Sequence, residues 1–258
     1  LMSYTRLLLL PALLLLIPAM AQTTATGFLD KSVEVDGKTQ RYALYVPDNY
    51  DPAKKWPLIV FLHGSGERGD DNLLQTEVGL PSAIRLHRDW FPTLVLIPQC
   101  PDKKFWDVAV PTIEAAMAQT QADYSVDDKA ITLTGLSLGG YATWIWGALK
   151  TDTFAALMPV CGGGDIAHVM GELSPEEAQV YGTMEDRVKK LATIPIWAFH
   201  GKDDDVVLPA RSQEMVDRVK KAGGDVRYKE WKDTGHNSWD ATYGHKRAMA
   251  WLLKQRKK

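Results

Sequence analysis

The sequence predicts an α/β fold in which helices cover both faces of a mostly parallel sheet. Five short segments are apolar without alternation, as strands are when both faces of their sheet are buried. Helical segments fall between these strands, and such alternation builds parallel sheets with right-handed crossovers. Two segments near the N-terminus instead alternate between polar and apolar residues, which predicts an antiparallel hairpin.

The elements follow in order from the hairpin. Its strands are expected at 32–35 and 41–46, with Asp36-Gly37 as the turn. The apolar strands are expected at 58–62, 94–97, 131–134, 155–160 and 194–199, and a last strand near 226–231. The helices are expected at 113–122, 138–149, 209–221 and about 242–253. The segment 172–190 suits either a helical excursion over the active site or plain surface, and we expect surface that contributes to the rim of the site.

The N-terminal segment resembles a secretory signal peptide. Arg6 precedes an apolar run over 7–17, and Ala19-Met20-Ala21 forms an Ala-x-Ala cleavage pattern. The run is short for a transmembrane span, although an uncleaved anchor is the alternative. We therefore expect a bacterial signal peptide at 1–21, export to the periplasm or the medium, no stable membrane insertion after cleavage, and one catalytic domain over 22–258.

The composition sets limits on partners and cofactors. Of 258 residues, 45% are hydrophobic and 24% are charged, which suits one globular domain. The formal net charge of −2 gives no field that would attract nucleic acid, so no such partner is expected. Cys100 and Cys161 each follow a different predicted strand, and we expect two separate buried thiols rather than a disulfide. The oligomeric state is left open.

A nucleophile motif lies between a predicted strand and a predicted helix. Gly135-Leu136-Ser137-Leu138-Gly139 matches G-x-S-x-G in the strand-turn-helix context that this elbow requires. The turn exposes a serine hydroxyl and leaves no room for side chains two residues before and after it. Ser137 is therefore the expected nucleophile.

A serine nucleophile needs a base that a third group orients. His236 follows the last predicted strand, in a loop that can reach the carboxyl edge of the sheet. Three aspartates, 203–205, follow the preceding strand, and residue spacing alone does not choose among them. The chain order Ser, Asp, His is that of the α/β-hydrolase fold. His63 and His200 begin His-Gly turns and are expected to shape loops.

Two backbone N–H groups are expected to form an oxyanion hole. Ser65 lies in the Gly-rich turn 63–66 after an early strand, and Leu138 follows the nucleophile. Trp106 and Gln99 lie near another strand end, so we consider them substrate-binding residues, and a packed loop aromatic is the alternative interpretation of Trp106. No cluster of Cys and His has metal-ligand spacing, so no metal is expected.

Five segments together resemble a family of bacterial serine esterases. They are 63–69, 98–101, 135–144, 161–165 and 235–240, within a match over roughly 32–253. The family is the phospholipase/carboxylesterase and dienelactone-hydrolase-like branch of the α/β-hydrolases, near feruloyl and acetyl-xylan esterases. Some members carry the label "predicted peptidase" because they are similar to prolyl oligopeptidase catalytic domains.

The resemblance implies ester hydrolysis without a metal or an organic cofactor. Its acid motif, H-G-x-x-D-x-x-V, falls on Asp204 and Val207, although Leu208 separates this valine from Pro209 where the family often has Val-Pro. The expected substrates are small-molecule or polysaccharide-linked esters, such as feruloyl, acetyl or other short-chain esters.

Two other functions compete with the esterase. A serine peptidase of the prolyl oligopeptidase kind would use the same chemistry, but such enzymes usually carry a large gating domain, which we do not expect here. A non-catalytic binding protein on the same fold is the second alternative, and the intact Ser, Asp and His argue against it.

Overall fold

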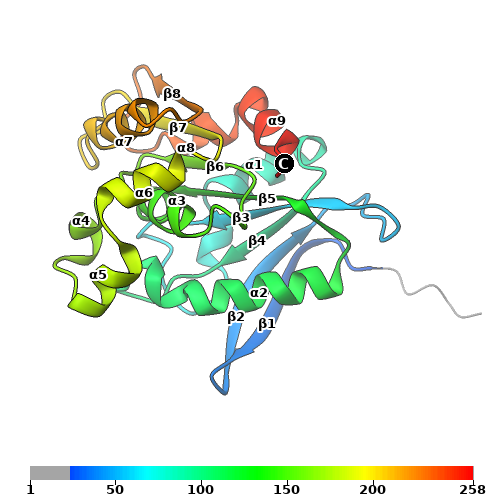
Figure 1. The fold of residues 1–258 in the computed structure, drawn as a ribbon. Helices are drawn as coiled ribbons and strands as arrows, with labels where there is room; N and C mark the ends of the chain where they lie inside the picture. Colours follow the sequence, from blue (N-terminus) through cyan, green and yellow to red (C-terminus); the bar gives the residue numbers. More distant parts are fainter. Residues whose placement is uncertain (1–23, 258) are drawn as a thin grey trace, which may run out of the picture.

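The central feature of the fold is an eight-stranded sheet (Figure 1). The computed structural model describes residues 24–257, so the predicted signal peptide lies outside the described residues. The strands are β1 (Gly27–Val35), β2 (Lys38–Val46), β3 (Trp56–Leu62), β4 (Leu94–Pro98), β5 (Val126–Leu136), β6 (Leu157–Val160), β7 (Ile196–Gly201) and β8 (Val226–Trp231).

The strand order is β1-β2-β4-β3-β5-β6-β7-β8. β2 pairs antiparallel with both β1 and β4, whereas every pair from β4 to β8 is parallel. The predicted hairpin is confirmed: Asp36 and Gly37 have φ of 49° and 71°, the left-handed conformation that a two-residue hairpin turn requires. The mostly parallel sheet with an N-terminal antiparallel hairpin is the α/β-hydrolase arrangement that the sequence predicts.

Helices cover both faces of this sheet. The α-helices are α1 (Leu80–Leu86), α2 (Val110–Asp123), α3 (Leu138–Leu149), α4 (Ile166–Met170), α5 (Pro175–Tyr181), α6 (Met184–Leu191), α7 (Ala210–Lys221), α8 (Trp239–Tyr243) and α9 (Lys246–Lys254). Short 3-10 turns lie at Leu74–Thr76, Arg88–Trp90 and Trp106–Ala109. One buried layer joins α2, α3, α6 and α7 to the sheet, and the other joins α1, α8 and α9.

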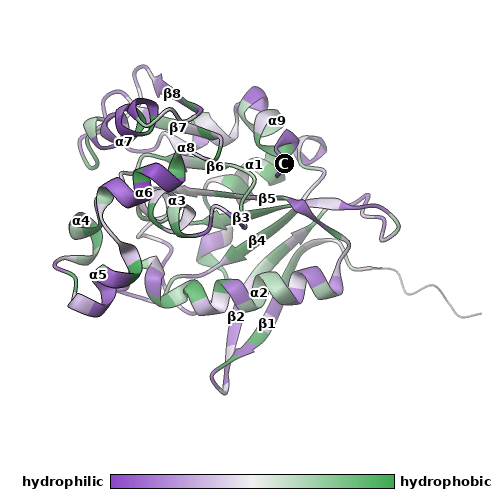
Figure 2. Ribbon diagram, viewed as in Figure 1, coloured by the Kyte–Doolittle hydropathy of each residue, from purple (hydrophilic) through white to green (hydrophobic). Residues whose placement is uncertain are grey.

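Hydropathy follows these layers. Figure 2 shows the central strands β3 and β4 as hydrophobic and much of α5, α6 and α7 as hydrophilic. α3 is the exception among the helices, since every residue from Gly139 to Ala148 is buried. This matches the prediction of a helix that is apolar nearly all round, and it explains how α3 can support the turn at its own N-terminus. None of the helices among residues 24–257 has the length and apolarity that crossing a membrane requires.

The sequence placed some boundaries wrongly. The expected last helix at about 242–253 is two helices, because His245 starts a new one by accepting a hydrogen bond from the Ala248 N–H. The segment 172–190 contains α5 and most of α6, and it is largely exposed, so it is both helical and surface. α1 was not predicted, since its seven residues are too few to show a helical period.

The two cysteines are free and buried, as expected. Cys100 follows β4 and Cys161 follows β6, and two other strands separate these in the sheet. At about 4.8 Å per strand, the strand ends are roughly 14 Å apart, far beyond the reach of a disulfide.

Candidate active site

The turn between β5 and α3 holds Ser137 in a strained conformation. Its φ of 51° and ψ of −114° lie where side chains are rarely tolerated. The flanking glycines permit this turn: a Cβ on Gly135 would lie 2.4 Å from the Gly139 carbonyl oxygen, and a Cβ on Gly139 would lie 2.0 Å from the Leu62 carbonyl oxygen. The predicted elbow geometry is therefore present.

Three side chains from distant parts of the chain form a chain of hydrogen bonds at this turn. Ser137 Oγ lies 2.9 Å from His236 Nε2, and His236 Nδ1 lies 2.8 Å from Asp204 Oδ2. Ser137 follows β5, Asp204 follows β7 and His236 follows β8. Since these strands are parallel, their carboxyl ends meet at one edge of the sheet, which brings together residues 99 positions apart.

The structure distinguishes the three neighbouring aspartates. Asp204 is 3% exposed, whereas Asp203 and Asp205 are both exposed. The second oxygen of Asp204, Oδ1, accepts the backbone N–H groups of Val206 and Val207 at 3.0 and 2.9 Å. The carboxylate is thus fixed by its own loop and directed at His236, in agreement with the register that the resemblance implied.

The loop after β3 lies against Ser137. A Cβ on Gly64 would lie 3.6 Å from Ser137 Cβ, so this loop touches the elbow. The Gly64 N–H donates to Glu67 Oε2 at 2.9 Å. Within residues 24–257, the N–H groups of Ser65 and Leu138 have no hydrogen-bond partner, so both are available to a ligand.

His63 holds this loop through hydrogen bonds at both of its ring nitrogens. The Cys100 N–H donates to His63 Nε2 at 2.9 Å, so the proton of the neutral ring is on Nδ1, which donates to the Gly64 carbonyl oxygen at 2.6 Å. The ring is fully buried, and burial lowers the pKa of His63 to about 4. Burial also raises the pKa of the nearby Glu67 carboxyl. The sequence indicated that His63 shapes a loop, but it gave no signal for Glu67.

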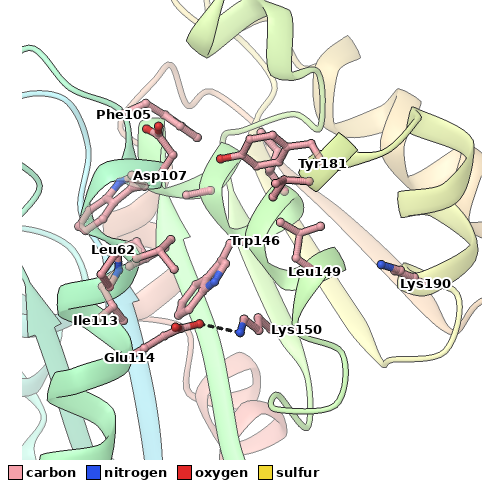
Figure 3. Close-up of a pocket in the computed structure, with 16 residues that line it drawn as sticks. Leu62, Phe105, Asp107, Ile113, Glu114, Trp146, Leu149, Lys150, Tyr181 and Lys190 are labelled. Atoms are coloured by element: carbon pink, nitrogen blue, oxygen red, sulfur yellow. Dashed lines mark ion pairs between the residues drawn. The ribbon is translucent and has the colours of Figure 1, made fainter. Parts of the chain in front are cut away.

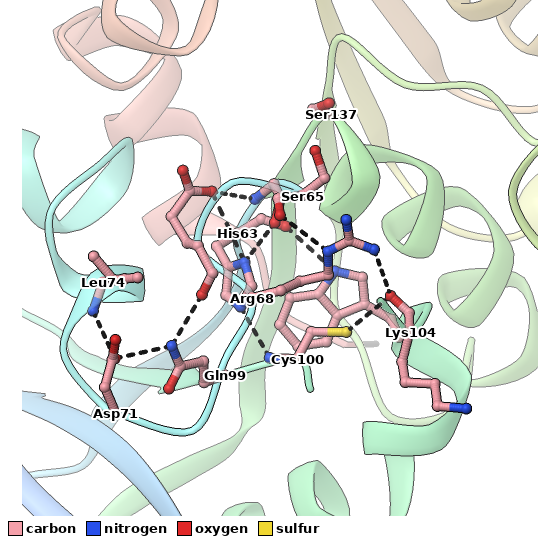
Figure 4. Close-up of polar contacts among 12 residues, drawn as sticks. His63, Ser65, Arg68, Asp71, Leu74, Gln99, Cys100, Lys104 and Ser137 are labelled. Atoms are coloured by element: carbon pink, nitrogen blue, oxygen red, sulfur yellow. Dashed lines mark hydrogen bonds and ion pairs between the residues drawn. The ribbon is translucent and has the colours of Figure 1, made fainter. Parts of the chain in front are cut away.

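Gln99 (Figure 4) and Trp106 hold the same loop. The Gln99 amide donates to the Glu67 carbonyl oxygen and to Asp71 Oδ1, each at 3.0 Å, and accepts the Asn72 N–H at 2.7 Å. Trp106 is 1% exposed and donates its indole N–H to the His63 carbonyl oxygen at 3.3 Å. The polar groups of both residues thus face the loop, while Trp106 also lines the cavity described next.

Residues of α2, α3 and α5 line a cavity of about 440 Å³ (Figure 3). Trp106, Trp146 and Tyr181 line it, and the ion pair of Glu114 and Lys150 (2.6 Å) lies at one end. The α3 residues that line it are Ala142, Ile145, Trp146 and Leu149, and Lys150 follows directly after the helix. Ala142 lies one turn beyond Leu138 on the same helix face, so the cavity begins one turn from the elbow. Its volume is typical of small-molecule sites.

One group of metal-ligating atoms coincides with the hydrogen-bonded chain. Cys161, Asp204 and His236 offer donor atoms within 4.8 Å of one another. The sequence spacing had not suggested this group, since the three residues follow three different strands. However, His236 and Asp204 already bond each other through Nδ1 and Oδ2. A metal ion would have to replace that hydrogen bond.

Curated relatives are similar over most of this chain. An "Uncharacterized secreted protein" of Arthroderma benhamiae is 25% identical over 242 residues, which cover 86% of this chain but only 25% of that protein. The "Probable feruloyl esterase C" of Aspergillus niger is 25% identical over 226 residues, which cover 85% of this chain and 75% of that protein. The chain therefore spans a quarter of the length of the first relative and three quarters of the second.

A solved structure described as a thermostable esterase superposes with a TM-score of 0.74 and 32% identity. The alignment covers 89% of this chain and 63% of that chain. Residues 107–258, more than half of the chain, match the model of the prolyl oligopeptidase family. Because this match covers more than half of the chain, and the α/β-hydrolase sheet and the serine elbow agree with it, the chain belongs to the prolyl oligopeptidase family.

Proposed function

We propose that the protein is a serine carboxylic ester hydrolase with Ser137 as nucleophile, His236 as base and Asp204 as the acid that orients the base. One observation carries the proposal: an unbroken line of hydrogen bonds runs from the buried Asp204 through His236 to the strained Ser137. A serine hydroxyl needs this arrangement to become a nucleophile at neutral pH.

The geometry supports acyl transfer in two steps, which are acylation of Ser137 and hydrolysis of the acyl-enzyme. Ser137 Oγ attacks the ester carbonyl carbon while His236 Nε2 takes its proton, and Asp204 stabilises the imidazolium that forms. The tetrahedral intermediate collapses when His236 returns the proton to the leaving alcohol, which gives an acyl-enzyme. A water molecule then attacks the acyl carbon with the same proton transfers in reverse order, and Ser137 is released with the carboxylic acid.

The oxyanion of each intermediate needs donors that are already in place. We assign this role to the backbone N–H groups of Ser65 and Leu138, because neither has a partner in the part of the chain that the structure describes. The buried His63 and the Glu67 carboxylate hold the Ser65 loop, so its N–H does not have to reorganise during the reaction.

The cavity along α3 favours an ester with an apolar or aromatic part. Its walls are mainly aromatic and aliphatic, and its lining residue Ala142 lies one helical turn after Leu138, the residue that follows Ser137. Feruloyl or acetyl esters of plant polysaccharides, and other short-chain esters, are the substrates that we propose. We also propose that residues 1–21 are a signal peptide, that 22–258 form a single catalytic domain, and that the protein is exported, in keeping with the similarity to a secreted protein.

The direct test compares the wild-type protein with Ser137→Ala. We expect the wild type to hydrolyse p-nitrophenyl acetate and to be labelled by a fluorophosphonate at Ser137. The variant should lose activity by up to about 10⁶-fold, the scale of nucleophile loss in subtilisin. Circular dichroism checks that the variant is folded. More than a few per cent residual activity in a purified, folded Ser137→Ala preparation would exclude Ser137 as the nucleophile.

The family match supports a second candidate, a serine peptidase, because the matching family is that of prolyl oligopeptidase. The same triad would cleave an amide. Parallel assays with a chromogenic dipeptide and with methyl ferulate, acetylated xylan and p-nitrophenyl esters of increasing chain length separate the two functions. Turnover of the dipeptide at a higher kcat/KM than any ester would favour the peptidase.

A further inference from the structure

A second histidine contacts the carboxylate that we assign to the triad. His200 is the fifth residue of β7, and its side chain is fully buried. Its Nε2 lies 3.1 Å from Asp204 Oδ2, the same oxygen that lies 2.8 Å from His236 Nδ1. One carboxylate oxygen therefore faces two imidazole rings.

The surroundings of His200 decide where its proton lies. Nε2 also lies 2.7 Å from the Val207 carbonyl oxygen. Both neighbours of Nε2 are acceptors, so this nitrogen carries a proton that Val207 and Asp204 share. Burial lowers the pKa of His200, which keeps the ring neutral at the pH where the enzyme would work.

The other side of the ring is fixed to the fold. Ser212 Oγ on α7 lies 2.7 Å from His200 Nδ1 and 2.7 Å from the Gly162 carbonyl oxygen, and in the neutral ring with its proton on Nε2 the single hydroxyl proton of Ser212 is donated to Nδ1. Ser212 is itself fully buried. Contacts on both nitrogens leave the ring little freedom to rotate, so the direction of its Nε2–H is set by β7, α7 and the segment after β6.

The titratable groups that face His200 are few. Asp204 and His236 act on it electrostatically, and the Cys161 thiol lies within 4.8 Å of the donor atoms of these two residues. The Ser212 hydroxyl is uncharged. The negative charge of Asp204 is therefore shared between an Nε2–H of fixed direction and the ring that we assign as the base.

We propose that His200 is a positioning residue that fixes the rotamer of Asp204 and limits how much of its charge acts on His236. The inference rests on the proposed triad. Without the His200 N–H, Asp204 would be freer to turn, and its full charge would favour the imidazolium form of His236. The rate should then fall, and the enzyme should need a higher pH to keep its base neutral.

Two substitutions separate positioning from packing. In His200→Gln, the amide N–H replaces the donor at Nε2, whereas His200→Phe fills the space without a donor. We expect His200→Phe to lower kcat about tenfold, the scale of one lost hydrogen bond to a charged group. The acid limb of its kcat/KM profile should move up by about half a pH unit or more. His200→Gln should stay within about threefold of wild type, with an unmoved limb.

The controls keep the proposal falsifiable. His87→Gln removes a histidine that only stacks on Trp90 and should change neither kcat nor the profile. If His200→Phe does not fold, Ser212→Ala serves in its place, because it removes the partner of His200 Nδ1 and should shift the limb in the same direction by a smaller amount. A folded His200→Phe, or in its absence Ser212→Ala, with unchanged kcat and limb overturns the proposal. So does a His200→Gln variant as defective as His200→Phe.

A second measurement needs no substrate. Nitrogen-15 NMR of the histidine rings follows the protonation of His236 in the protein without substrate. We expect this protonation to occur at a higher pH in His200→Phe than in wild type. If the wild type hydrolyses no ester, the proposed function fails, while this titration still decides whether His200 acts on the Asp204–His236 pair. An unmoved titration overturns the inference even in an active esterase.

Discussion

Three adjacent carboxylates differ sharply in burial and in their hydrogen bonds. Asp203, Asp204 and Asp205 have the same chemistry, but only Asp204 is buried and only Asp204 lies within hydrogen-bond distance of His236. Two backbone N–H groups hold its other oxygen. The two exposed aspartates can be changed without altering this arrangement.

Asparagine substitutions test this distinction. Asp204→Asn should lower kcat by about 10⁴-fold, the loss found for the equivalent change in a serine protease, because the neutral amide no longer stabilises the correct tautomer of His236. Asp203→Asn and Asp205→Asn should each stay within about threefold of wild type, since exposed charges contribute little. The measurement is steady-state kinetics with one short-chain ester. A severe Asp205→Asn variant beside a mild Asp204→Asn variant would show that the acid is assigned wrongly.

At this scale, the sequence predicted the chain of hydrogen bonds but not its supports. Ser137 and His236 followed from the elbow and from strand order, and the resemblance selected Asp204. Ser212 could not be found, because it acts through a contact between α7 and β7 that no local spacing encodes, and nothing in the sequence separates the Glu67 carboxylate, which accepts the N–H of Gly64 three residues earlier, from an exposed loop acid. Gln99 and Trp106 were predicted near the site, and the sequence did not reveal that their polar groups hold the loop after β3, while Trp106 also lines the cavity along α3.

At the scale of elements, the elbow and the loop after β3 form one unit. Gly64 is close to Leu136, the residue before the nucleophile: a Cβ on Gly64 would lie 2.9 Å from Leu136 Cδ1 and 3.1 Å from Glu67 Oε2. Gly66, two residues later, has nothing within 4 Å of such a Cβ. The two glycines therefore offer a matched pair in one loop.

Gly64→Ala should displace the loop and misdirect the Ser65 N–H. We expect kcat to fall about tenfold to a hundredfold, which is at most the scale of losing one oxyanion donor, with a smaller change in KM. Gly66→Ala should be close to wild type, and so should Ser65→Ala, because a main-chain donor survives a change of side chain. Steady-state kinetics on all three folded variants checks this. A Ser65→Ala variant as inactive as Ser137→Ala would show that the Ser65 hydroxyl is essential.

Element boundaries were predicted best where the sequence contains a long apolar helical segment or a two-residue turn motif. The Asp36-Gly37 turn and the buried helix α3 lie where they were expected. The sequence predicted one helix at about 242–253, although the polar run Gly244-His245-Lys246-Arg247 interrupts its apolar residues. The N-cap at His245 depends on a single contact with the Ala248 N–H, which periodicity does not reveal.

At the scale of the whole molecule, the buried histidines link the site to stability in acid. His63 is fully buried between the end of β3 and Trp106, with ring centroids 4.6 Å apart. Its pKa is lowered from the usual 6.5 to about 4 because burial disfavours the charged ring. The unfolded chain therefore takes up a proton at a pH where the folded chain does not. The contribution of the neutral His63 ring to the free energy of unfolding is fully present above pH 6.5 and is lost as the pH falls towards 4.

This linkage predicts a stability loss that one substitution should reduce. Between pH 7.5 and 4.5, His63 should account for about 2–3 kcal/mol of lost unfolding free energy. The lowered pKa of His200 acts in the same direction, whereas the raised pKa of Glu67 acts in the opposite one.

The His63→Gln variant isolates the contribution of His63. His200 and Glu67 are present in both proteins, so their contributions cancel when the variant is compared with wild type, and the glutamine oxygen can still accept the Cys100 N–H. Urea unfolding of the two proteins at both pH values measures the difference. The variant should be less stable than wild type at pH 7.5 and should lose less on acidification. Equal losses in both proteins would mean that His63 already titrates normally in the folded state, and the acid sensitivity would then have to come from other groups.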